Sequence, residues 1–354
     1  MKVVVAGGGT AGHIEPAMNV ADAIKAKYPN AEIVALGTAR GLETELVPAR
    51  GYRLELIEPV PLPRKLNFDL LSLPVRLRKA IKQCRTVIAD ADILIGFGGY
   101  VALPAYLAAK NRIPLIVHEA NAKAGLANRI GARFAVAVAE TVPGSLPNAT
   151  LSGLPLRSTI AHFDRANLRE QALKFFNLNP DQPVLLVFGG SQGAAKINQT
   201  IDQCLRQNLF SEIQVIHAVG SKNELPSELP PNYHAVHYID RMDLAYAAAD
   251  FVISRSGAMT VAELTAAGLP ACFVPFPIGN GEQRLNAAEV VKAGGALSVA
   301  DEDFDDSYVR DHVLPIVIDK NRREQMAEIS KKFGRRDASE KILALIDSAL
   351  VGSK

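Results

Sequence analysis

The residues best suited to chemistry come first in the chain, in the stretch AGGGTAGHIEP at 6–16. It lies between an apolar run and a segment of helical pattern, and glycines at such a turn let the backbone approach a phosphate. The spacing Gly7-x-Gly9-x-x-Gly12 matches the dinucleotide-binding fingerprint, but residues 36–38 are Leu-Gly-Thr where that fingerprint needs an acidic residue for the ribose. The sequence also lacks a P-loop with its lysine. The stretch therefore favours a diphosphate held by other means over a nicotinamide cofactor.

His13 directly follows the last glycine of this stretch, at the expected start of a helix. One interpretation is that the imidazole caps that helix or packs under the loop. The other is a general base, because the partial positive charge of a helix N-terminus disfavours the imidazolium and leaves the ring able to accept a proton. His118 and Glu119, at the end of another apolar run, form a rival pair, and either could instead be structural.

Two later stretches suit a sugar nucleotide. SRSGAMTVAEL (254–264) predicts a strand, a turn and a helix with Glu263 in its second turn, where the carboxylate could accept hydrogen bonds from ribose hydroxyls or simply be solvated. In GEQRLNAAEVV (281–291), Gln283 and Asn286 share one helix face. Their amides both donate and accept, which suits sugar hydroxyls, although a capping role would explain either residue alone.

Short apolar runs rich in Val and Ile alternate with longer amphipathic segments along the whole chain. Runs that are apolar at every position indicate parallel strands buried on both faces, with helices as crossovers. The predicted strands are 2–7, 31–37, 91–99, 114–120 and 134–140 in a first series, and 183–190, 213–220, 235–239, 250–257 and 270–277 in a second. From residue 305 the pattern is helical and ends in an amphipathic helix at 337–352. The fold class is therefore α/β, with two doubly wound parallel-sheet domains.

The strand rhythm breaks at 152–164, which predicts the junction between the two domains. A second glycine loop, LLVFGGSQGAAKIN (185–198), echoes the first loop in the other half of the chain. Ligands of open α/β sheets bind outside the carboxyl ends of the strands. We therefore expect the two loops to face each other across an interdomain cleft.

Composition narrows the class of protein. The 354 residues are 48% hydrophobic and 21% charged, as in a globular protein, and the net charge of +2 gives no large basic field for nucleic acid. Cys84, Cys204 and Cys272 form an odd set without CxxC spacing, which favours a reducing compartment over disulfides or zinc. The chain starts directly with a strand pattern, and its apolar runs are too short to span a membrane. We expect a cytoplasmic protein.

Residues 63–85 combine cations with apolar side chains, against a single acidic residue, Asp69. Such a segment can insert apolar side chains into a membrane interface while its cations meet anionic lipids. The alternative is an ordinary surface helix packed on its own sheet. The predicted membrane patch consists of Leu66, Phe68, Leu70, Leu71, Leu73, Arg76, Arg78, Lys79 and Lys82. Attachment through it would be peripheral, on the inner face of the cell membrane.

Many sugar-nucleotide enzymes hold a metal with a DxD motif. The stretches at 90–92 and 301–303 match this motif. The first precedes a strand, at the wrong edge for ligands, and the second follows the last predicted strand. Both are interpreted as solvated loops, so the sequence predicts no obligatory metal and no cofactor.

Six stretches occur in the order typical of one family: GGGTAGH, GFGGYVALPAYLAA, HEANAKAGLANR, VFGGSQGAAKIN, SRSGAMTVAELTAAGLP and EQRLNAA. From the first strand to the last helix, the sequence resembles the MurG family of peptidoglycan glycosyltransferases. The resemblance implies the GT-B fold, with two Rossmann-like domains. Residues 1–157, joined by the helix at 336–354, would form the acceptor and membrane side. Residues 158–335 would bind UDP-N-acetylglucosamine (UDP-GlcNAc).

The resemblance also implies the reaction and the partners. N-acetylglucosamine would move, with inversion, from UDP-GlcNAc to the 4-hydroxyl of the N-acetylmuramic acid in lipid I (undecaprenyl-diphospho-MurNAc-pentapeptide), giving lipid II. The further partners implied are an anionic membrane surface and proteins of cell-wall synthesis and division, with no nucleic acid. Two alternatives remain: another GT-B enzyme on the same donor, such as a UDP-GlcNAc 2-epimerase, and a silent UDP-sugar binder.

Carried over by position, the resemblance favours His13 as the candidate base, and Glu119, from its place at the end of a strand, stays a weaker candidate. Arg157 would contact the donor, Ser191 a phosphate, the backbone of Ile239 the uracil and Gln283 the sugar hydroxyls. The full set of implied substrate-binding residues is Thr10, Ala11, Gly12, Asn121, Arg157, Ser191, Ile239, Ala258, Met259, Thr260, Val261, Ala262, Glu263, Gln283 and Asn286. Two positions depart from the family pattern: Ala11 replaces a glycine and Ala120 replaces a glutamine.

Overall fold

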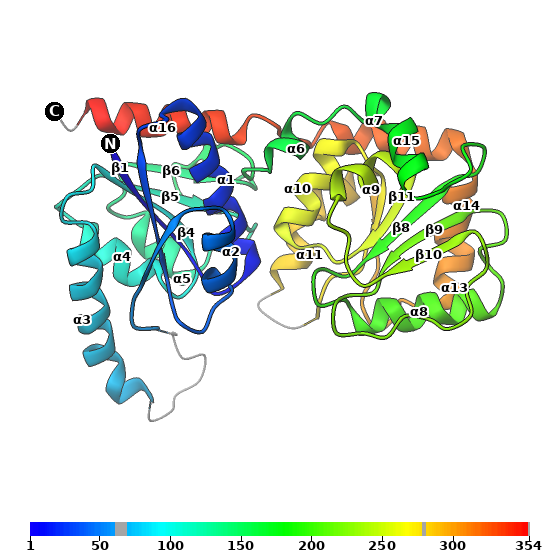
Figure 1. The fold of residues 1–354 in the computed structure, drawn as a ribbon, viewed down its shortest axis with the longest axis horizontal. Coiled ribbons are helices and arrows are strands. Elements are labelled where there is room, and N and C mark those ends of the chain that lie inside the picture. Colours follow the sequence, from blue (N-terminus) through cyan, green and yellow to red (C-terminus); the bar gives the residue numbers. More distant parts are fainter. Residues whose placement is uncertain (61–68, 278–280, 353–354) are drawn as a thin grey trace. The chain divides into compact units, whose positions relative to one another are not determined.

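A computed structural model of the chain describes residues 1–60, 69–277 and 281–352 (Figure 1). The chain divides into two compact units. Unit 1 comprises Met1–Arg157 and Arg336–Lys354, and unit 2 comprises Ser158–Arg335. Each unit contains one parallel sheet, and the two are described separately below.

Unit 1 alternates strands and helices. Its strands are β1 (Lys2–Gly7), β2 (Glu32–Gly37), β3 (Arg53–Leu56), β4 (Ile93–Gly98), β5 (Leu115–Glu119), β6 (Ala137–Glu140) and β7 (Thr150–Leu151). Its helices are α1 (Ala11–Lys27), α2 (Glu43–Ala49), α3 (Asp69–Val87), α4 (Ala102–Ala109), α5 (Leu126–Gly131) and α16 (Ala338–Val351). The strands run parallel in the order β3-β2-β1-β4-β5-β6-β7. The order reverses between β1 and β4, which is where open α/β sheets bind ligands.

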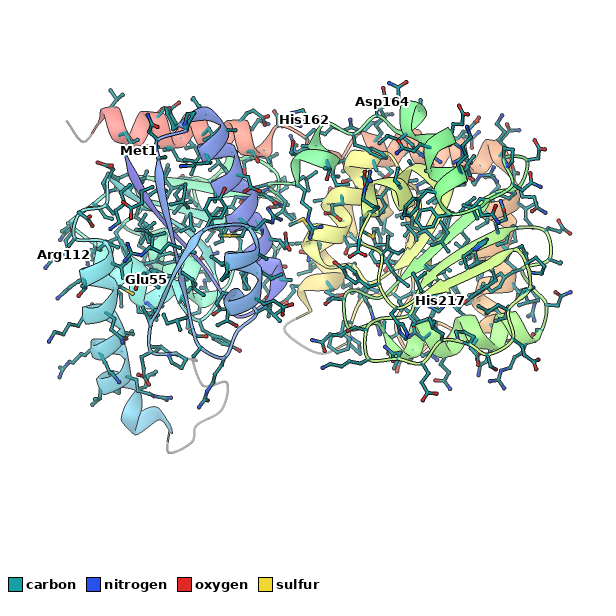
Figure 2. The ribbon with its side chains drawn as sticks, viewed as in Figure 1. Met1, Glu55, Arg112, His162, Asp164 and His217 are labelled. Carbon is teal, nitrogen blue, oxygen red and sulfur yellow. The ribbon has the colours of Figure 1, made fainter. Side chains whose placement is uncertain are left out.

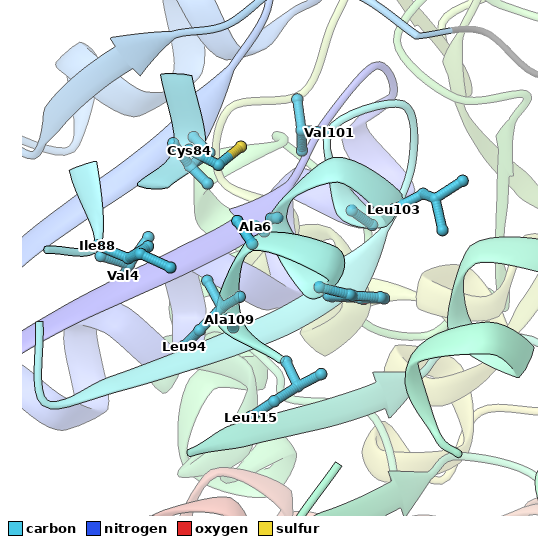
Figure 3. Packing of buried hydrophobic residues seen from close by; sticks show 14 of the residues in the cluster. Val4, Ala6, Cys84, Ile88, Leu94, Val101, Leu103, Ala109 and Leu115 are labelled. Atoms are coloured by element: carbon cyan, nitrogen blue, oxygen red, sulfur yellow. The ribbon is translucent and has the colours of Figure 1, made fainter. Parts of the chain in front are cut away.

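The core of unit 1 lies on both faces of this sheet, because successive residues of a strand point to opposite faces. Val4 and Ala6 of β1 belong to one buried cluster, which includes Cys84 of α3 and Ala109 of α4 (Figure 3). Val3 and Val5 belong to a second cluster, which contains apolar residues of α1 and α16. Burial on both faces is the reason why these strands are apolar at every position.

Unit 2 repeats the design. Its strands are β8 (Val184–Phe188), β9 (Gln214–Ala218), β10 (Tyr233–Val236), β11 (Phe251–Ser254), β12 (Ala271–Phe273) and β13 (Ala296–Ser298). Its helices are α6 (Ser158–Ala161), α7 (Arg165–Phe175), α8 (Ala195–Arg206), α9 (Met242–Ala248), α10 (Ala258–Ala267), α11 (Glu282–Asn286), α12 (Ala288–Lys292), α13 (Asp306–Tyr308), the π-helical turn η1 (Val309–Val313), α14 (Leu314–Ile318) and α15 (Lys320–Lys331). The parallel strand order, β10-β9-β8-β11-β12-β13, reverses between β8 and β11. The second switch point is therefore equivalent to the first.

The ten strands predicted from the sequence are confirmed, and the chain after residue 305 is helical as predicted. Three strands were not predicted: β3, β7 and β13. Each lies at an edge of its sheet. β3 carries charged residues because it is partly exposed, and the other two contain two and three residues, so none leaves an apolar run in the sequence. Within the described residues, no helix has the length and apolar character needed to cross a membrane.

Candidate functional site

The first glycine loop leaves β1 at the switch point of unit 1. Gly7 of β1 pairs with Gly98 of β4, so the two strand ends lie side by side. Gly9 has a φ of +92°, and a Cβ on it would lie 3.1 Å from the ring of Tyr100. Thr10 is extended, and α1 begins directly after it without a side-chain cap or an acidic residue in its first turn. The loop therefore brings the positive end of a 17-residue helix to the ligand-binding edge of the sheet.

The two departures from the family pattern have a local explanation. Ala11 is the first residue of α1 and has a helical backbone, which alanine adopts more readily than glycine. Ala120 follows β5 and is buried, with 3% of its surface exposed. A small apolar side chain therefore suits both positions.

His13 lies in the first turn of α1 and is half-buried. A Cβ on Gly98 would come within 3.1 Å of the His13 Cε1 atom and 3.4 Å of the Asn128 amide nitrogen. The imidazole therefore lies against the bare backbone at the end of β4, beside the switch point. A partly exposed imidazole in this position is able to accept a proton from a bound hydroxyl.

His118 is completely buried at the end of β5. Its Nε2 lies 2.9 Å from the Gly153 carbonyl oxygen, so the ring donates a hydrogen bond there. Burial lowers the pKa of His118 to about 4. The neutral ring thus joins β5 to the segment after β7, which is the structural alternative for this residue.

Glu119 is 2% exposed, and its carboxylate holds the loop that follows β5. It accepts hydrogen bonds from the Asn121 backbone N–H (2.9 Å), the Gly125 backbone N–H (3.1 Å) and the Asn128 side-chain amide (2.8 Å). These contacts are typical of a carboxylate that organises a loop. They favour a structural role for Glu119 over proton transfer, and they fix the backbone of Asn121.

Asn128 was missed by the sequence analysis although it lies within one of the family motifs. It is 1% exposed, its amide donates to Glu119 and to the His118 carbonyl oxygen (3.1 Å), and its Oδ1 accepts from the Tyr106 hydroxyl (2.7 Å). A single asparagine in the sequence gives no indication that its side chain joins such a network. Asn128 therefore connects the end of β5, Glu119 and α4 in a way that only the tertiary contacts reveal.

Arg157 ends the first segment of unit 1. Its guanidinium lies 3.1 Å from the Glu15 carboxylate of α1, which also pairs with Arg50 at 2.8 Å. The Arg157 side chain is 38% exposed. Arg157, the donor-binding arginine implied by the resemblance, is thus ion-paired with the same helix that carries His13.

The second glycine loop leaves β8 at the switch point of unit 2. Gly193 has a φ of +78°, and a Cβ on it would lie 2.0 Å from the Val219 carbonyl oxygen, so only glycine fits. Ser191 is exposed, and its carbonyl oxygen accepts from the Ser221 backbone N–H at 3.1 Å. The loop leads into α8, a helix of 12 residues without an acidic residue in its first turn. This is a favourable environment for a phosphate.

The neighbouring turn joins β11 to α10. Phe188 of β8 pairs with Ser254 of β11, so this turn leaves the sheet beside the second glycine loop. Residues 258–263 form the half-buried first turns of α10. The Tyr246 hydroxyl donates to the Glu263 carboxylate at 2.7 Å, which orients that carboxylate.

The two amides of α11 contact backbone groups at the same edge of the sheet. The Asn286 amide donates to the Ser256 carbonyl oxygen at 3.4 Å, and the Gln283 carbonyl oxygen accepts from the Phe276 N–H at 3.0 Å. Ile239, which follows β10, is 5% exposed. The structure thus brings Ser191, residues 258–263 and Asn286 to the carboxyl edge of one sheet.

Three of the aspartates in the two DxD stretches have partners within the protein. Asp90 pairs with the Lys2 ammonium at 2.5 Å, Asp92 accepts from the Lys2 backbone N–H at 2.7 Å, and Asp301 pairs with Arg255. Within the part of the chain that the structure describes, no three His, Cys, Asp or Glu side chains form a metal-binding group.

The predicted membrane patch falls partly on α3. Leu66 and Phe68 lie outside the described residues, as do the side chains of Leu70 and Leu71. Ala80 and Cys84 of α3 are buried against the sheet, whereas Val75 is 68% exposed. Arg78, Lys79 and Lys82 are exposed, and Leu73 and Arg76 are half-buried. The described part of α3 is therefore amphipathic, with Arg78, Lys79 and Lys82 on the solvent side.

Comparison with known proteins gives matches over both units. Residues 3–140 match the glycosyltransferase family 28 N-terminal domain, and residues 184–342 match the family 28 C-terminal domain. A Streptomyces coelicolor protein named UDP-N-acetylglucosamine–N-acetylmuramyl-(pentapeptide) pyrophosphoryl-undecaprenol N-acetylglucosamine transferase is 54% identical, over 99% of this chain and 98% of its own length. A protein of the same name from Mycobacterium sp. (strain KMS) is 56% identical, over 97% of this chain and 94% of its own length.

Solved structures agree with the observed architecture. The crystal structure of Acinetobacter baumannii MurG has a TM-score of 0.79 at 26% identity and covers 98% of this chain and 99% of its own. A UDP-GlcNAc 2-epimerase from Neisseria meningitidis has a TM-score of 0.66 at 16% identity, covers 98% of this chain and 100% of its own, and shares the fold alone. The two parallel-sheet units have the GT-B fold, and the chain belongs to glycosyltransferase family 28 and, within it, to the MurG family.

Proposed function

We propose that the chain is an inverting glycosyltransferase that moves N-acetylglucosamine from UDP-GlcNAc to the 4-hydroxyl of the MurNAc in lipid I, giving lipid II. Relatives named for this transfer share more than half of the sequence over nearly the whole chain. The observation that carries the proposal is the half-buried His13 imidazole against Gly98, at the switch point of unit 1. A transferase needs a base at such a position, whereas a silent binder does not.

In this mechanism His13 removes the proton of the acceptor hydroxyl as its oxygen attacks C1 of the sugar. The bond between C1 and the diphosphate oxygen breaks on the opposite side, so the configuration at C1 inverts. The neutral form of His13 is the competent one, because an imidazolium has no lone pair for the proton. His118 and Glu119 support the loop beside this site and do not take part in proton transfer.

Unit 2 supplies most of the donor contacts, and Arg157 and Asn121 belong to unit 1. The loop with Ser191, the start of α8 and the guanidinium of Arg157 stabilise the charge on departing UDP by aimed hydrogen-bond donors, without a metal. Glu263 accepts from the ribose hydroxyls with the orientation set by Tyr246. The backbone of Ile239 contacts the uracil, and residues 258–262 line the nucleotide. Gln283, Asn286 and Asn121 bind the sugar hydroxyls, and Thr10, Ala11 and Gly12 face the acceptor and the phosphates.

A lipid-linked acceptor requires contact with a membrane. The exposed cations of α3 and the exposed Val75 suit peripheral attachment to anionic lipids on the cytoplasmic face. Proteins of cell-wall synthesis and division are the further partners that this role implies.

The test is UDP release from UDP-GlcNAc with and without a short-chain lipid I analogue. Acceptor-dependent release is expected, and His13→Ala should lower kcat by about 10²–10⁴-fold while the Kd for UDP-GlcNAc stays unchanged. His162→Ala, which removes an exposed histidine of unit 2, is the matched control and should keep the wild-type rate. Donor binding without any acceptor-dependent release would contradict the proposed transfer.

A further inference from the structure

A buried carboxylate lies directly beneath the first glycine loop. Glu43, the first residue of α2, has no exposed surface. Three glycines pack so closely against Glu43 that a larger residue would clash with it. A Cβ on Gly8 would lie 3.2 Å from the Glu43 Oε1 atom and a Cβ on Gly37 would lie 2.4 Å from Cγ. A Cβ on Gly41 would lie 1.9 Å from Oε2. The backbone on three sides is therefore bare where the carboxylate packs.

The carboxylate accepts hydrogen bonds from two separate loops. Its Oε1 accepts from the Thr38 backbone N–H (2.7 Å) and the Thr38 hydroxyl (3.0 Å), at the end of β2. Its Oε2 accepts from the Gly9 backbone N–H (3.0 Å). No ion pair between described residues includes Glu43. Moving a carboxylate from water into the protein interior costs free energy, which its hydrogen bonds must offset. The partners of the Glu43 carboxylate therefore indicate what it does.

The contact with Gly9 changes what the first loop can do. In a dinucleotide-binding loop the backbone N–H groups donate to a diphosphate. Here the Gly9 N–H donates to a fixed negative charge, and an anion at the same point would be repelled. The Gly9 N–H therefore serves a contact within the protein, and only the groups from Thr10 onward are left to face a phosphate.

The same loop is also packed against the end of β4. A Cβ on Gly99 would lie 2.0 Å from the Gly8 carbonyl oxygen, and the neighbouring Gly98 is the residue that the His13 ring contacts. Glu43 thus holds the loop from the β2 side while β4 supports it from the other. Gly9 immediately precedes Thr10 and the first turn of α1, so its position sets where that turn begins.

We propose that Glu43 is a positioning residue: its carboxylate fixes Gly9, and through Gly9 the start of α1, so that His13 meets the acceptor hydroxyl in a productive orientation. Glu43 itself has no exposed surface through which to touch a substrate. This inference rests on the proposed function for its kinetic consequence, but its structural content concerns the loop alone.

Glu43→Gln is the test substitution, because glutamine has the same shape but a single acceptor oxygen. It cannot accept from both Thr38 and Gly9, so one N–H faces an amide donor. Glu140→Gln is the matched control. Glu140 is also a buried carboxylate of unit 1, and it accepts from the Gly144 N–H (2.9 Å), the Leu146 N–H (3.1 Å) and the Ser145 hydroxyl (3.0 Å) at the end of β6.

Glu43→Gln is expected to lower kcat/KM for the lipid I analogue by roughly tenfold or more, with the Kd for UDP-GlcNAc within about twofold of wild type. Amide hydrogen exchange should become faster from Gly9 to His13. Glu140→Gln should lower the thermal stability about as much as Glu43→Gln does. It should change neither kcat/KM for the lipid I analogue nor the exchange rates from Gly9 to His13. Equal kinetic losses in the two variants, or unchanged exchange at Gly9 in Glu43→Gln, would overturn the proposal.

If Glu43→Gln fails to fold, Thr38→Val replaces it, since this change removes one of the three hydrogen bonds that hold the carboxylate. A fall of about threefold in kcat/KM for the acceptor is then expected, and an unchanged value contradicts the proposal. A wild-type chain that binds UDP-GlcNAc but transfers nothing would instead contradict the proposed function. In that case the exchange rates at Gly9 to His13 still decide the role of Glu43.

Discussion

Residues of one type have different roles in this chain according to their burial, as the histidines show. His217 of β9, labelled in Figure 2, is 2% exposed. Its Nδ1 lies 2.6 Å from the Tyr233 hydroxyl and its Nε2 3.2 Å from the Oδ1 atom of the Asn198 side chain. The amide oxygen of Asn198 can only accept, so Nε2 donates and Nδ1 accepts from the hydroxyl. The ring is therefore neutral, and burial lowers the pKa of His217 to about 4.

This burial predicts a loss of stability in acid. The pKa of His217 is about 4 in the folded chain and ~6.5 when unfolded, so the unfolded chain takes up the proton first as the pH falls. The contribution of neutral His217 to the free energy of unfolding is fully present above pH ~6.5 and is lost as the pH falls toward ~4. The loss between pH ~7.5 and ~5 is about 2 kcal/mol. His217→Gln should flatten the pH dependence of the urea-unfolding free energy by this amount, whereas His162→Gln, at an exposed position, should not. An unchanged slope in His217→Gln would refute the assignment.

At the scale of elements, the end of the chain completes the core of its beginning. Ile342, Leu343 and Ile346 of α16 are buried in the same cluster as Val3 and Val5 of β1. The Asp347 carboxylate also accepts from Lys27 and from the Tyr28 hydroxyl at the end of α1, each at 2.5 Å. α16 thus packs along α1, and the core of unit 1 depends on residues far apart in the sequence (Figure 1).

Truncation of the buried face of α16 should destabilise unit 1. Ile346→Ala leaves a cavity beside α1 and is expected to lower the free energy of unfolding by about 2–4 kcal/mol. Val351→Ala, in the same helix but at a side chain that is 77% exposed, should change it by less than about 0.5 kcal/mol. Thermal and urea unfolding measure both variants, and equal effects would show that α16 does not contribute to the core.

The exposed cations of α3 predict membrane binding that depends on charge. Arg78 and Lys82 lie four residues apart on the helix and are both exposed. Their joint replacement by alanine should weaken binding to vesicles of anionic phospholipid by about 2 kcal/mol, roughly thirtyfold, because each cation near such a surface contributes about 1 kcal/mol.

A control with the same change in charge is available in unit 2. Lys174 and Lys320 are exposed, and their double replacement by alanine should leave vesicle binding unchanged. Co-sedimentation at low and high salt measures both, since salt screens exposed charges. Equal binding of the α3 double variant and the wild type would contradict the patch on this helix.

At the scale of the whole molecule, the first six strands of unit 1 and the six strands of unit 2 have the same order, but the chemistry at the two switch points differs. Unit 1 has an imidazole and a buried carboxylate beside its glycine loop, whereas unit 2 has a glycine loop followed by the start of α8. The first arrangement suits proton transfer and the second suits binding of a phosphate. One architecture thus supports the two parts of a transfer reaction.

If hydrogen-bond donors of the protein stabilise departing UDP, the reaction is expected to be insensitive to chelators. The aspartates at 90 and 301 are paired with Lys2 and Arg255, and backbone donors and Arg157 are assigned to the UDP charge. Acceptor-dependent UDP release should therefore keep its rate in EDTA. A rate that collapses in EDTA and returns with Mg²⁺ would assign the charge stabilisation to a metal instead.

Much of the fold could be predicted from the sequence because its signals are local. Strands buried on both faces are apolar at each position, and a glycine turn before a helix places Gly7 to Gly12 and Gly189 to Gly193 at strand ends. The edge strands β3, β7 and β13 could not be predicted, since short or exposed strands carry no such run. Family motifs supplied the site residues, and the role of each remains a prediction for experiment.

The sequence by itself determined the α/β class, the two series of strands and the residue types at the switch points, because periodicity and turn chemistry act over a few residues. The tertiary structure alone decided which polar groups meet. Gly9 and Glu43 are 34 positions apart, and His118 and Gly153 are 35 apart. Contacts at such separations arise from strand order and packing, so neither the buried Glu43 nor the network of Asn128 could be recognised before the chain was folded.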